Sequence, residues 1–522
     1  MLSASTIWIA FGVYMVFLLG VAVFVTQKEK RQKVGGSLLT ASVPWPVLVM
    51  TYIASLMSTW VFFAGPGAYY RGGLGYWISE LSYIALFPII AHFTMNKVWI
   101  VNKQRKGAFT TPADFYYDRF KSPVLRTILG IIFLAASFPY ISSVLVAIAQ
   151  AAQYATDGAI NYRMAVIVVG LIMTVFVCVG GVKSAAMADT VQGLLFILML
   201  WVIVIACLIV GFGGSLNLAL DNLWEHTQSF FSYPGPSGWT PYAGRFGYPF
   251  SCAIGWTIML PHVFVRSGYF GDNLKAQRKL SFLTPVLQAV VWTGTMMIGL
   301  IGLALVNNLA ASESELIIPY MIKNFVLNFN PVLAKVLMVG FFVGASAVGL
   351  STANAFLSVS SAIVSSDLIK NTFHINVPKS KETLVNRIII AVLGLGSLLL
   401  AIDPPDLIFT LIMFSIAIVM PLFPILVAGL YWKKATKQAA IVSAIVGTVL
   451  VLLTYFVWNI GGTWYGAIGM LGSTITMVVV SLFTKQPESD AAPFYEALES
   501  GMKRYYVVKD KKSAKAAAKA GE

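Results

Sequence analysis

Charged residues are scarce in this chain of 522 residues. They make up 11% of it, hydrophobic residues make up 58%, and the mean hydropathy is +0.79. Because soluble domains carry about 25% charged residues, this composition excludes a water-soluble enzyme, a nucleic-acid binder and a disordered scaffold. Cysteine is scarce as well: Cys178, Cys207 and Cys252 stand singly in apolar runs without CxxC spacing. The sequence therefore indicates neither a disulfide framework nor a thiolate metal site.

Long apolar runs dominate the chain instead. A helix needs about 20 apolar residues to cross the hydrocarbon core of a membrane. Thirteen runs suit such helices, at roughly 5–26, 45–70, 77–100, 124–154, 163–180, 190–213, 248–268, 281–308, 332–365, 387–402, 405–431, 439–459 and 466–484. The sequence predicts an all-α polytopic membrane protein with about 13 transmembrane helices, of which 387–402 is the shortest.

The basic residues predict how these spans are oriented, because cytoplasmic loops are enriched in Lys and Arg. The first run has no basic stretch before it and is followed by Lys28, Lys30, Arg31 and Lys33, so we expect an uncleaved helix with its N-terminus outside. With 13 spans, 31 basic residues lie on the cytoplasmic side and 5 outside, and the C-terminus is cytoplasmic. The net charge of +15 thus reports orientation in the cell (inner) membrane and attraction to the lipid bilayer, without a nucleic-acid partner.

Two segments outside the membrane have distinct compositions. The largest external loop, about 214–247, is rich in Gly, Pro and aromatic residues and is expected to form a packed cap. The segment after Lys485 ends in KDKKSAKAAAKAGE, which is polar and cationic, so we expect a mobile cytoplasmic tail.

Polar clusters inside the spans are candidate functional sites, because polar groups are costly in lipid. In the second span, Ser55, Ser58 and Thr59 precede the sequence Gly65-Pro66-Gly67. This pattern is compatible with a broken helix, whose free carbonyls can coordinate a cation. Alternatively, the hydroxyls bond back to carbonyls one turn earlier and the proline only kinks the helix.

The ninth span carries the second cluster, a run of small and hydroxyl residues between Gly344 and Ser361. The adjacent hydroxyls of Ser351 and Thr352, with the carbonyl of Val348 one turn earlier, offer the hard neutral oxygens that an alkali cation prefers. Close helix packing through small residues explains the same run equally well.

Two further clusters contain ionisable residues. Asp189 and Gln192 lie near the start of the sixth span, where Asp189 is either an N-terminal cap or part of a polar face. Near the inner end of the seventh span, His262 suits a packed, hydrogen-bonded histidine and Arg266 an interfacial anchor. Glu80, in the third span, is expected at the outer interface.

Together these segments resemble the sodium:solute symporter family along nearly the whole chain. The likeness rests on four elements: the GG-x-x-A-x-x-x-D-x-x-Q run that ends at Asp189 and Gln192, the Ser351-Thr352 pair followed by Asp367-Leu368, Leu-Pro261-His262 with Arg266, and Gly65-Pro66-Gly67-Ala68. Within the family, the chain most resembles sodium/pantothenate and monocarboxylate permeases, a likeness to which Asp403-Pro404-Pro405 and Gly429-Leu-Tyr431-Trp432 add.

The resemblance implies a five-plus-five inverted repeat of the leucine-transporter type, with one extra N-terminal and two extra C-terminal helices. The corresponding divisions are 1–44 for the first helix and its basic loop, 45–431 for the transport core, 432–484 for the last two helices and 485–522 for the tail. Carried over by position, the family's principal Na⁺ site uses five uncharged oxygens: carbonyls of Ala54, Met57 and Val348 and hydroxyls of Ser351 and Thr352.

Two departures from the family pattern bear on stoichiometry. Some relatives have an aspartate where this chain has Leu56, so no carboxylate assists the cation there. Relatives with a second Na⁺ site have serines where this chain has Asn354 and Ala355, which predicts one Na⁺ per solute. None of the five proposed ligands titrates near pH 7, and this favours Na⁺ over a proton.

The resemblance also implies a substrate cavity and coupling residues. Polar and aromatic groups expected to line the cavity are Ser58, Thr59, Tyr140, Ser143, Trp256 and Thr257. The candidate coupling or gating residues are Asp189, Gln192 and His262. No basic residue is evident at the midplane, so a carboxylate would be held by a half-helix N-terminus and hydroxyls.

The expected function is sodium-coupled import of a small organic solute, expected to be anionic: a monocarboxylate or pantothenate. Three alternatives stay open: a sodium or proton symporter for a neutral solute such as an amino acid, a transporter-like membrane sensor and a passive channel. A sensor needs an output domain, for which about 38 residues after the last span are too few. An enzyme is not expected, because the spans carry no nucleophile–base pair and no metal-ligand cluster.

Overall fold

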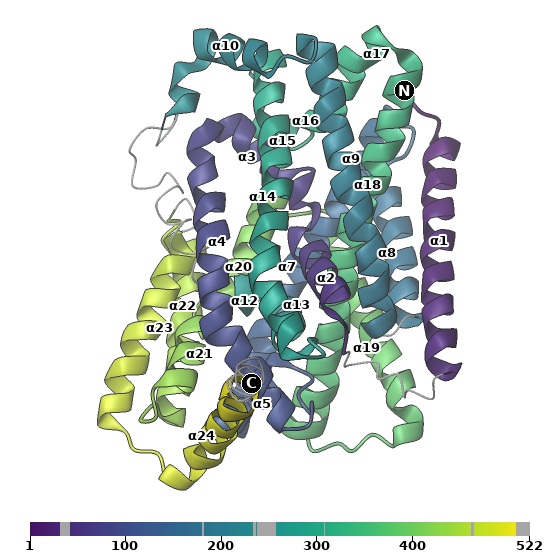
Figure 1. Cartoon of the computed structure of the whole chain (residues 1–522). Coiled ribbons are helices and arrows are strands. Elements are labelled where there is room, and N and C mark those ends of the chain that lie inside the picture. The colour runs from purple at the N-terminus through teal and green to yellow at the C-terminus, as the bar shows by residue number, and fades with distance from the viewer. Residues whose placement is uncertain are drawn as a thin grey trace, which may run out of the picture.

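The computed structural model is a bundle of long helices that run roughly parallel to one another (Figure 1). It describes residues 1–31, 42–179, 182–232, 236, 257–306, 308–460 and 464–507. Within these residues it contains no strand, apart from an isolated bridge between Val43 and Gly271. This all-helical architecture confirms the predicted fold class.

The long helices are separated by short helical segments and loops. The first helix is α1 (Ala4–Arg31). It is followed by α2 (Trp45–Met57), η1 (Thr59–Val61), α3 (Ala64–Gly72), η2 (Gly73–Tyr76), α4 (Trp77–Ile90), η3 (Ala91–Met95), α5 (Asn96–Gln104), α6 (Pro112–Phe120), α7 (Pro123–Ala155), α8 (Tyr162–Val179) and α9 (Val182–Phe212). The division into two repeats with extra helices stays a prediction.

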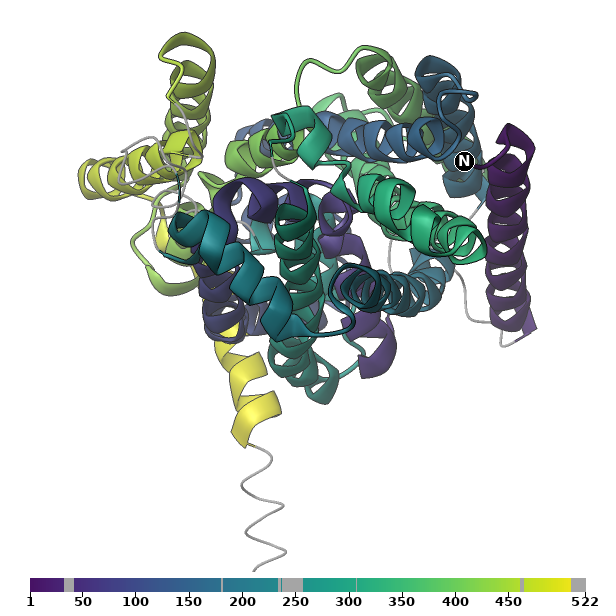
Figure 2. The ribbon, with the colours of Figure 1, turned by 90° about the horizontal axis from the view of Figure 1, so that it is seen from above.

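After the described residues resume at Thr257, the chain continues through a second series of helices. These are α12 (Thr257–Met259), α13 (Pro261–Tyr269), α14 (Leu274–Leu305), α15 (Ala311–Ser314), α16 (Ile317–Met321), η6 (Ile322–Val326), α17 (Leu327–Phe329), α18 (Pro331–Ala362), η7 (Ile363–Thr372), α19 (Lys379–Ile402), α20 (Ile408–Val419) and α21 (Leu422–Tyr431). The chain continues through α22 (Lys437–Leu452), η8 (Leu453–Val457), α23 (Trp464–Phe483), α24 (Glu488–Met502) and η9 (Lys503–Val507). Both views place α1 at one edge of the bundle and α22 with α23 at the other (Figures 1 and 2).

Ten helices in the described residues are long and apolar enough to cross a membrane, or 11 if a bent pair is one span. A shorter apolar helix covers Tyr162–Cys178. The predicted span 248–268 begins outside the described residues, so the count of 13 stays a prediction.

Two helices are interrupted. The first bends by 63° between α2 and the following Thr59–Tyr76 segment. Ser58 lies at the break with a φ of 54°, a left-handed conformation that no helix residue adopts. In the second, Leu260 is extended and Pro261 begins α13, because proline lacks the N–H that would continue a helix. Backbone bonds from Val43 N to Phe270 O (2.9 Å) and from Asp272 N to Val43 O (3.2 Å) join the two at their far ends.

Two segments outside the long helices are helical where they are described. Within the loop 214–247, α10 (Leu216–Thr227) lies across one end of the bundle, followed by η4 (Gln228–Phe231) (Figure 1). At the other end, the expectation of a mobile tail is wrong for Glu488–Val507, which form α24 and η9. The helix buries Ala491, Phe494, Tyr495 and Leu498, which follow a helical spacing. This spacing was overlooked because the last residues of the tail are polar and cationic.

Arg119 in α6 anchors this end of the molecule. Its side chain is fully buried, and its guanidinium donates to the carbonyls of Gly429 (3.0 Å), Trp432 (3.1 Å) and Ala435 (3.2 Å). The last carbonyls of a helix lack intrahelical partners, so Arg119 caps the C-terminus of α21.

We expect Arg119→Met to destabilise the protein by about 3 kcal/mol, because it leaves several buried carbonyls unsatisfied. Thermal unfolding in detergent measures this effect. The exposed neighbour Lys434 offers the control: Lys434→Met should leave the midpoint unchanged. Equal midpoints for the two variants would refute the capping role.

Candidate functional site

The carbonyls at the end of α2 are the starting point of the site. The last four carbonyls of an α-helix, here those of Ala54 to Met57, have no partner within the helix. Thr352 of α18 approaches this end: its hydroxyl lies 3.4 Å from the Ala54 carbonyl and donates to the Val348 carbonyl at 3.0 Å. These residues are buried. Three oxygens of the predicted Na⁺ site therefore converge from segments almost 300 residues apart.

The other two predicted ligands lie close to this group. Met57 is the last residue of α2, one turn after Ala54. Ser351 adjoins Thr352, and its hydroxyl donates to the Asp189 carboxylate at 2.8 Å. A hydroxyl that donates its proton to a carboxylate keeps its oxygen lone pairs available for a cation. The hydrogen bond to Asp189 thus leaves the lone pairs of the Ser351 oxygen available to a cation.

Asp189 connects four helices. It lies two turns inside α9, and Thr51 of α2 donates to its carboxylate at 2.5 Å. Arg266 of α13 donates to the same oxygen at 3.2 Å and to the Thr51 hydroxyl at 3.1 Å. The interpretation of Asp189 as a helix cap is therefore wrong. The interpretation of Arg266 as an interfacial anchor is wrong too, because only 2% of its surface is exposed.

Gln192 faces another partner. One turn beyond Asp189 on α9, its side-chain amide donates to the hydroxyl of Tyr14 on α1 at 2.7 Å. Both residues are buried. Gln192 thus fixes the extra N-terminal helix to the core, beside the Asp189 junction.

A cluster of rings lies between the two helix breaks. The His262 ring packs against Phe356 with ring centroids 3.8 Å apart, and Tyr140 lies 4.6 Å from Phe356. His262 Nε2 is 3.1 Å from the carbonyl of Ser55, and the Tyr140 hydroxyl interacts with Ser58. The expectation of a packed, hydrogen-bonded histidine is confirmed. Phe356 was missed, although it lies one turn after Thr352 on the same helix face.

The remaining predicted cavity residues are less informative. The Ser143 hydroxyl donates to the Tyr140 carbonyl of its own helix at 2.7 Å, and the Thr59 hydroxyl is 3.5 Å from that of Ser58. Trp256 and the side chain of Thr257 lie outside the described residues. Tyr140, Ser58 and Thr59 are thus the predicted cavity residues whose polar side chains the structure places around the break.

Glu80 is a buried acidic residue that was not predicted as a site residue. Its side chain in α4 is fully buried. Among the described side chains, neither carboxylate oxygen has a hydrogen-bond partner of normal geometry, and the indole of Trp60, just after the break, lies near the carboxyl group. A buried acceptor without donors is costly unless another molecule supplies them. The signal in the sequence is a lone acidic residue within an apolar span.

This arrangement suits a monovalent cation rather than a transition metal. The described residues contain no group of three or more His, Cys, Asp or Glu side chains that could hold a metal ion. The converging oxygens of Ala54, Val348 and Thr352 are neutral, and Arg266 compensates the charge of Asp189. The site therefore offers hard oxygens without a free negative charge.

The sequence profile of the sodium:solute symporter family matches residues 38–447. The chain belongs to this family. It is a multi-pass membrane transporter and not an enzyme, and Na⁺ is its coupling ion.

Individual relatives of the symporter differ in substrate. It is 27% identical to the sodium/pantothenate symporter of Haemophilus influenzae over 83% of this chain and 87% of that protein. It is 25% identical to the sodium/proline symporter of Escherichia coli over 84% of this chain and 85% of that protein. The solved outward-open, substrate-bound structure of a Na⁺-coupled sialic acid symporter matches with a TM-score of 0.73 at 18% identity, covering 92% of this chain and 99% of that one. The crystal structure of MhsT in complex with L-phenylalanine matches with a TM-score of 0.52 at 16% identity, covering 85% of this chain and 99% of that one. These two structural likenesses confirm the leucine-transporter type of fold.

Proposed function

We propose that this symporter imports a small organic solute together with one Na⁺ by alternating access. The ion is held by the carbonyls of Ala54, Met57 and Val348 and the hydroxyls of Ser351 and Thr352. The observation that carries the proposal is the contact of the Thr352 hydroxyl with the Ala54 carbonyl, because it joins the broken helix to α18 where α2 ends. An ion held between these two elements resists their separation, so Na⁺ occupancy acts on the geometry of the break.

The ion pair between Asp189 and Arg266 supports a ratio of one Na⁺ per solute. A second cation beside Asp189 would compete with the Arg266 guanidinium, which lies 3.2 Å from the carboxylate. Ala355, one turn after Ser351, offers no side-chain ligand. The guanidinium of Arg266 therefore already supplies the positive charge that a second Na⁺ would bring to Asp189.

This stoichiometry predicts how uptake depends on voltage. One Na⁺ with a monovalent anion moves no net charge, whereas one Na⁺ with a zwitterion moves one positive charge inward. We expect a negative interior, set by a potassium diffusion potential, to accelerate zwitterion uptake and to leave anion uptake unchanged. Acceleration of anion uptake would contradict the one-to-one ratio.

The surroundings of the break limit the solute. Arg266 is engaged by Asp189, so it is not free to pair with a carboxylate of the solute. Glu80 instead presents an acceptor beside Trp60. We propose a solute that carries hydroxyl, amide or ammonium donors as well as a carboxylate, as pantothenate and amino acids do. A bare monocarboxylate such as acetate has no hydrogen-bond donor for Glu80, so we expect it to bind less well.

Uptake into proteoliposomes tests the proposed function. We would impose an inward Na⁺ gradient and offer labelled pantothenate, proline, pyruvate and acetate in turn. Matched K⁺ and proton gradients provide the controls. The proposal predicts that only the Na⁺ gradient drives accumulation. It also predicts that pantothenate or proline accumulates to a higher level than pyruvate or acetate. Accumulation driven equally by the proton gradient would refute the assignment of the ion site.

Glu80→Gln should raise the solute KM by about 10- to 100-fold, since a buried polar group left without its partner costs about 1–3 kcal/mol. The Na⁺ concentration for half-maximal uptake should stay unchanged. The exposed Glu225 of α10 supplies the control substitution, Glu225→Gln, for which neither value should change. If Glu80→Gln shifts Na⁺ activation and leaves KM intact, the residue does not contact the solute.

A further inference from the structure

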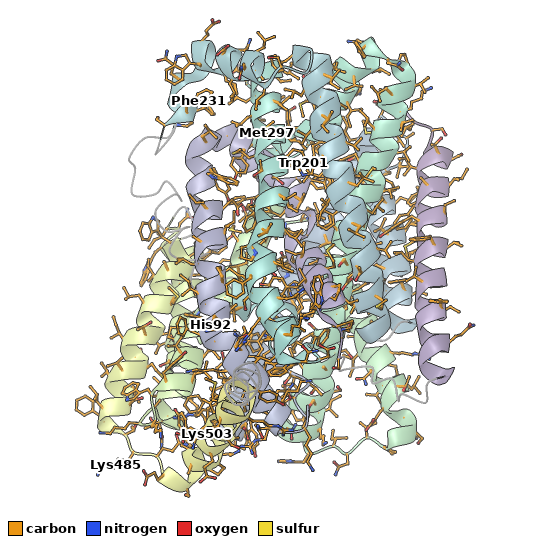
Figure 3. The ribbon with its side chains drawn as sticks, in the orientation of Figure 1. His92, Trp201, Phe231, Met297, Lys485 and Lys503 are labelled. Carbon is orange, nitrogen blue, oxygen red and sulfur yellow. The ribbon has the colours of Figure 1, made fainter. Side chains whose placement is uncertain are left out.

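A basic groove lies where α14 begins, at the opposite end of the molecule from Phe231. Its volume is about 660 Å³, and Lys275, Arg278, Lys279, Phe282 and Tyr505 are among its lining residues. Its lining, as far as the chain is described, contains three cations and no carboxylate. Lys503, next to the Tyr505 segment, lies at this same end of the bundle (Figure 3).

The lining residues of α14 follow one helical stripe. Lys275, Lys279 and Phe282 are spaced by four and three residues and therefore share a face. Beyond the cations, the same face of the helix carries exposed apolar side chains. Phe282 is 64% exposed and Val286 is 59% exposed. One turn of helix rises about 5.4 Å, so cations and apolar residues succeed each other within about 10 Å along the axis.

The opposite wall of the groove is held in place by aromatic contacts. The ring of Tyr505 in η9 packs edge-on against Trp99 of α5, with centroids 5.0 Å apart. On the other side, the Lys279 ammonium lies 3.7 Å from the ring centroid of Trp45, at the start of α2. Trp and Tyr are typical of the membrane–water interface. The groove is thus built from the first residues of α14 and the segment after α24.

We propose that this groove binds the headgroup of an anionic phospholipid from the adjoining membrane leaflet. The headgroup phosphate lies among Lys275, Arg278 and Lys279, and an acyl chain runs along Phe282 and Val286. A free phosphate would use the cations and leave the exposed apolar stripe without a partner, which is why a lipid fits better. Under the predicted topology this is the cytoplasmic leaflet, where anionic lipids gather.

Packing contacts connect this groove to the proposed ion site. Lys279 packs on Trp45, which begins the helix that carries Ala54 and Met57. α14 also lies against the segment after the break, where its Thr295 hydroxyl is 3.3 Å from the Val61 carbonyl of η1. A lipid that fixes the start of α14 therefore restrains both halves of the broken helix.

Native mass spectrometry of the full-length protein in detergent tests the proposal, with phosphatidylglycerol, phosphatidylcholine and inorganic phosphate as separate probes. We expect one phosphatidylglycerol to bind ahead of all others. The triple variant K275Q/R278Q/K279Q should weaken this first binding step by about 100-fold, since each basic residue near an anionic lipid surface contributes about fivefold. The control K370Q/K381Q/K485Q removes three exposed lysines from the same end of the molecule and should leave the step unchanged.

Three results would overturn the proposal. Equal weakening by both triple variants would mean general attraction to basic surface. Equal binding of phosphatidylcholine would mean an apolar groove without headgroup recognition, and displacement of the lipid by inorganic phosphate would mean a simple anion site. If the triple variant does not fold, Arg278→Gln and Phe282→Ala carry the test, each with an expected loss of about fivefold for phosphatidylglycerol.

Discussion

Thr352→Val should raise the Na⁺ concentration for half-maximal uptake by about 10- to 100-fold. Valine keeps the volume of threonine but removes the hydroxyl that lies between the carbonyls of Val348 and Ala54. An unsatisfied buried partner costs about 1–3 kcal/mol, which sets the size of the effect. Ser351→Ala should weaken Na⁺ activation on the same scale. Initial uptake rates over a series of Na⁺ concentrations measure both.

A buried threonine outside the transport core provides the control. Thr454, in η8, donates to the carbonyl of Leu450 at 2.6 Å, so Thr454→Val removes a similar helix-internal bond far from the proposed site along the chain. We expect it to leave Na⁺ activation unchanged. If both Thr352→Val and Ser351→Ala keep wild-type Na⁺ dependence, the ion is bound elsewhere.

Asp189→Asn and Arg266→Gln should each destabilise the symporter by about 3–5 kcal/mol, because each leaves one uncompensated charge in the interior. The pair is almost completely buried, with exposures of 0% and 2%. The double variant D189N/R266Q replaces the pair by neutral amides of similar shape, so it should recover most of the lost stability. Thermal unfolding of the four proteins in detergent gives the coupling energy.

The surface pair of Arg163 and Asp403 is the matched control. Its side chains are 65% and 72% exposed, and such pairs contribute about 0–1 kcal/mol. R163Q, D403N and their combination should therefore show little coupling. Additive effects in the Asp189–Arg266 series would show that the buried contact does not hold α9, α2 and α13 together.

Local chemistry in the sequence predicted two features that the structure contains. Gly65-Pro66-Gly67 after a hydroxyl cluster indicated the broken helix, and Ser58 does lie at the break. The neighbouring hydroxyls of α18 suited either oxygen ligands or close helix packing, and the Thr352 hydroxyl does lie 3.4 Å from the Ala54 carbonyl. Their role as ligands stays a prediction. Both signals lie within a few residues of one another, where side-chain type and spacing are sufficient.

The errors concern partners that are distant along the chain. Asp189 and Arg266 were interpreted separately, the first as a cap or part of a polar face and the second as an anchor, because 77 residues separate them and only the fold makes them an ion pair. Glu80 has no sequence neighbour that reveals its position beside Trp60. α24 was hidden by the cationic composition of the last residues, although its apolar residues follow a helical period.

The flux ratio tests the central claim most directly, which is that one Na⁺, held by neutral oxygens, crosses with each solute molecule. Parallel uptake of radioactive sodium and of the accumulated solute into the same proteoliposomes gives this ratio. We predict one Na⁺ per solute, with both fluxes falling together in Thr352→Val at low Na⁺. A ratio of two would contradict the role given to Arg266, and solute uptake without Na⁺ would contradict the ion site itself.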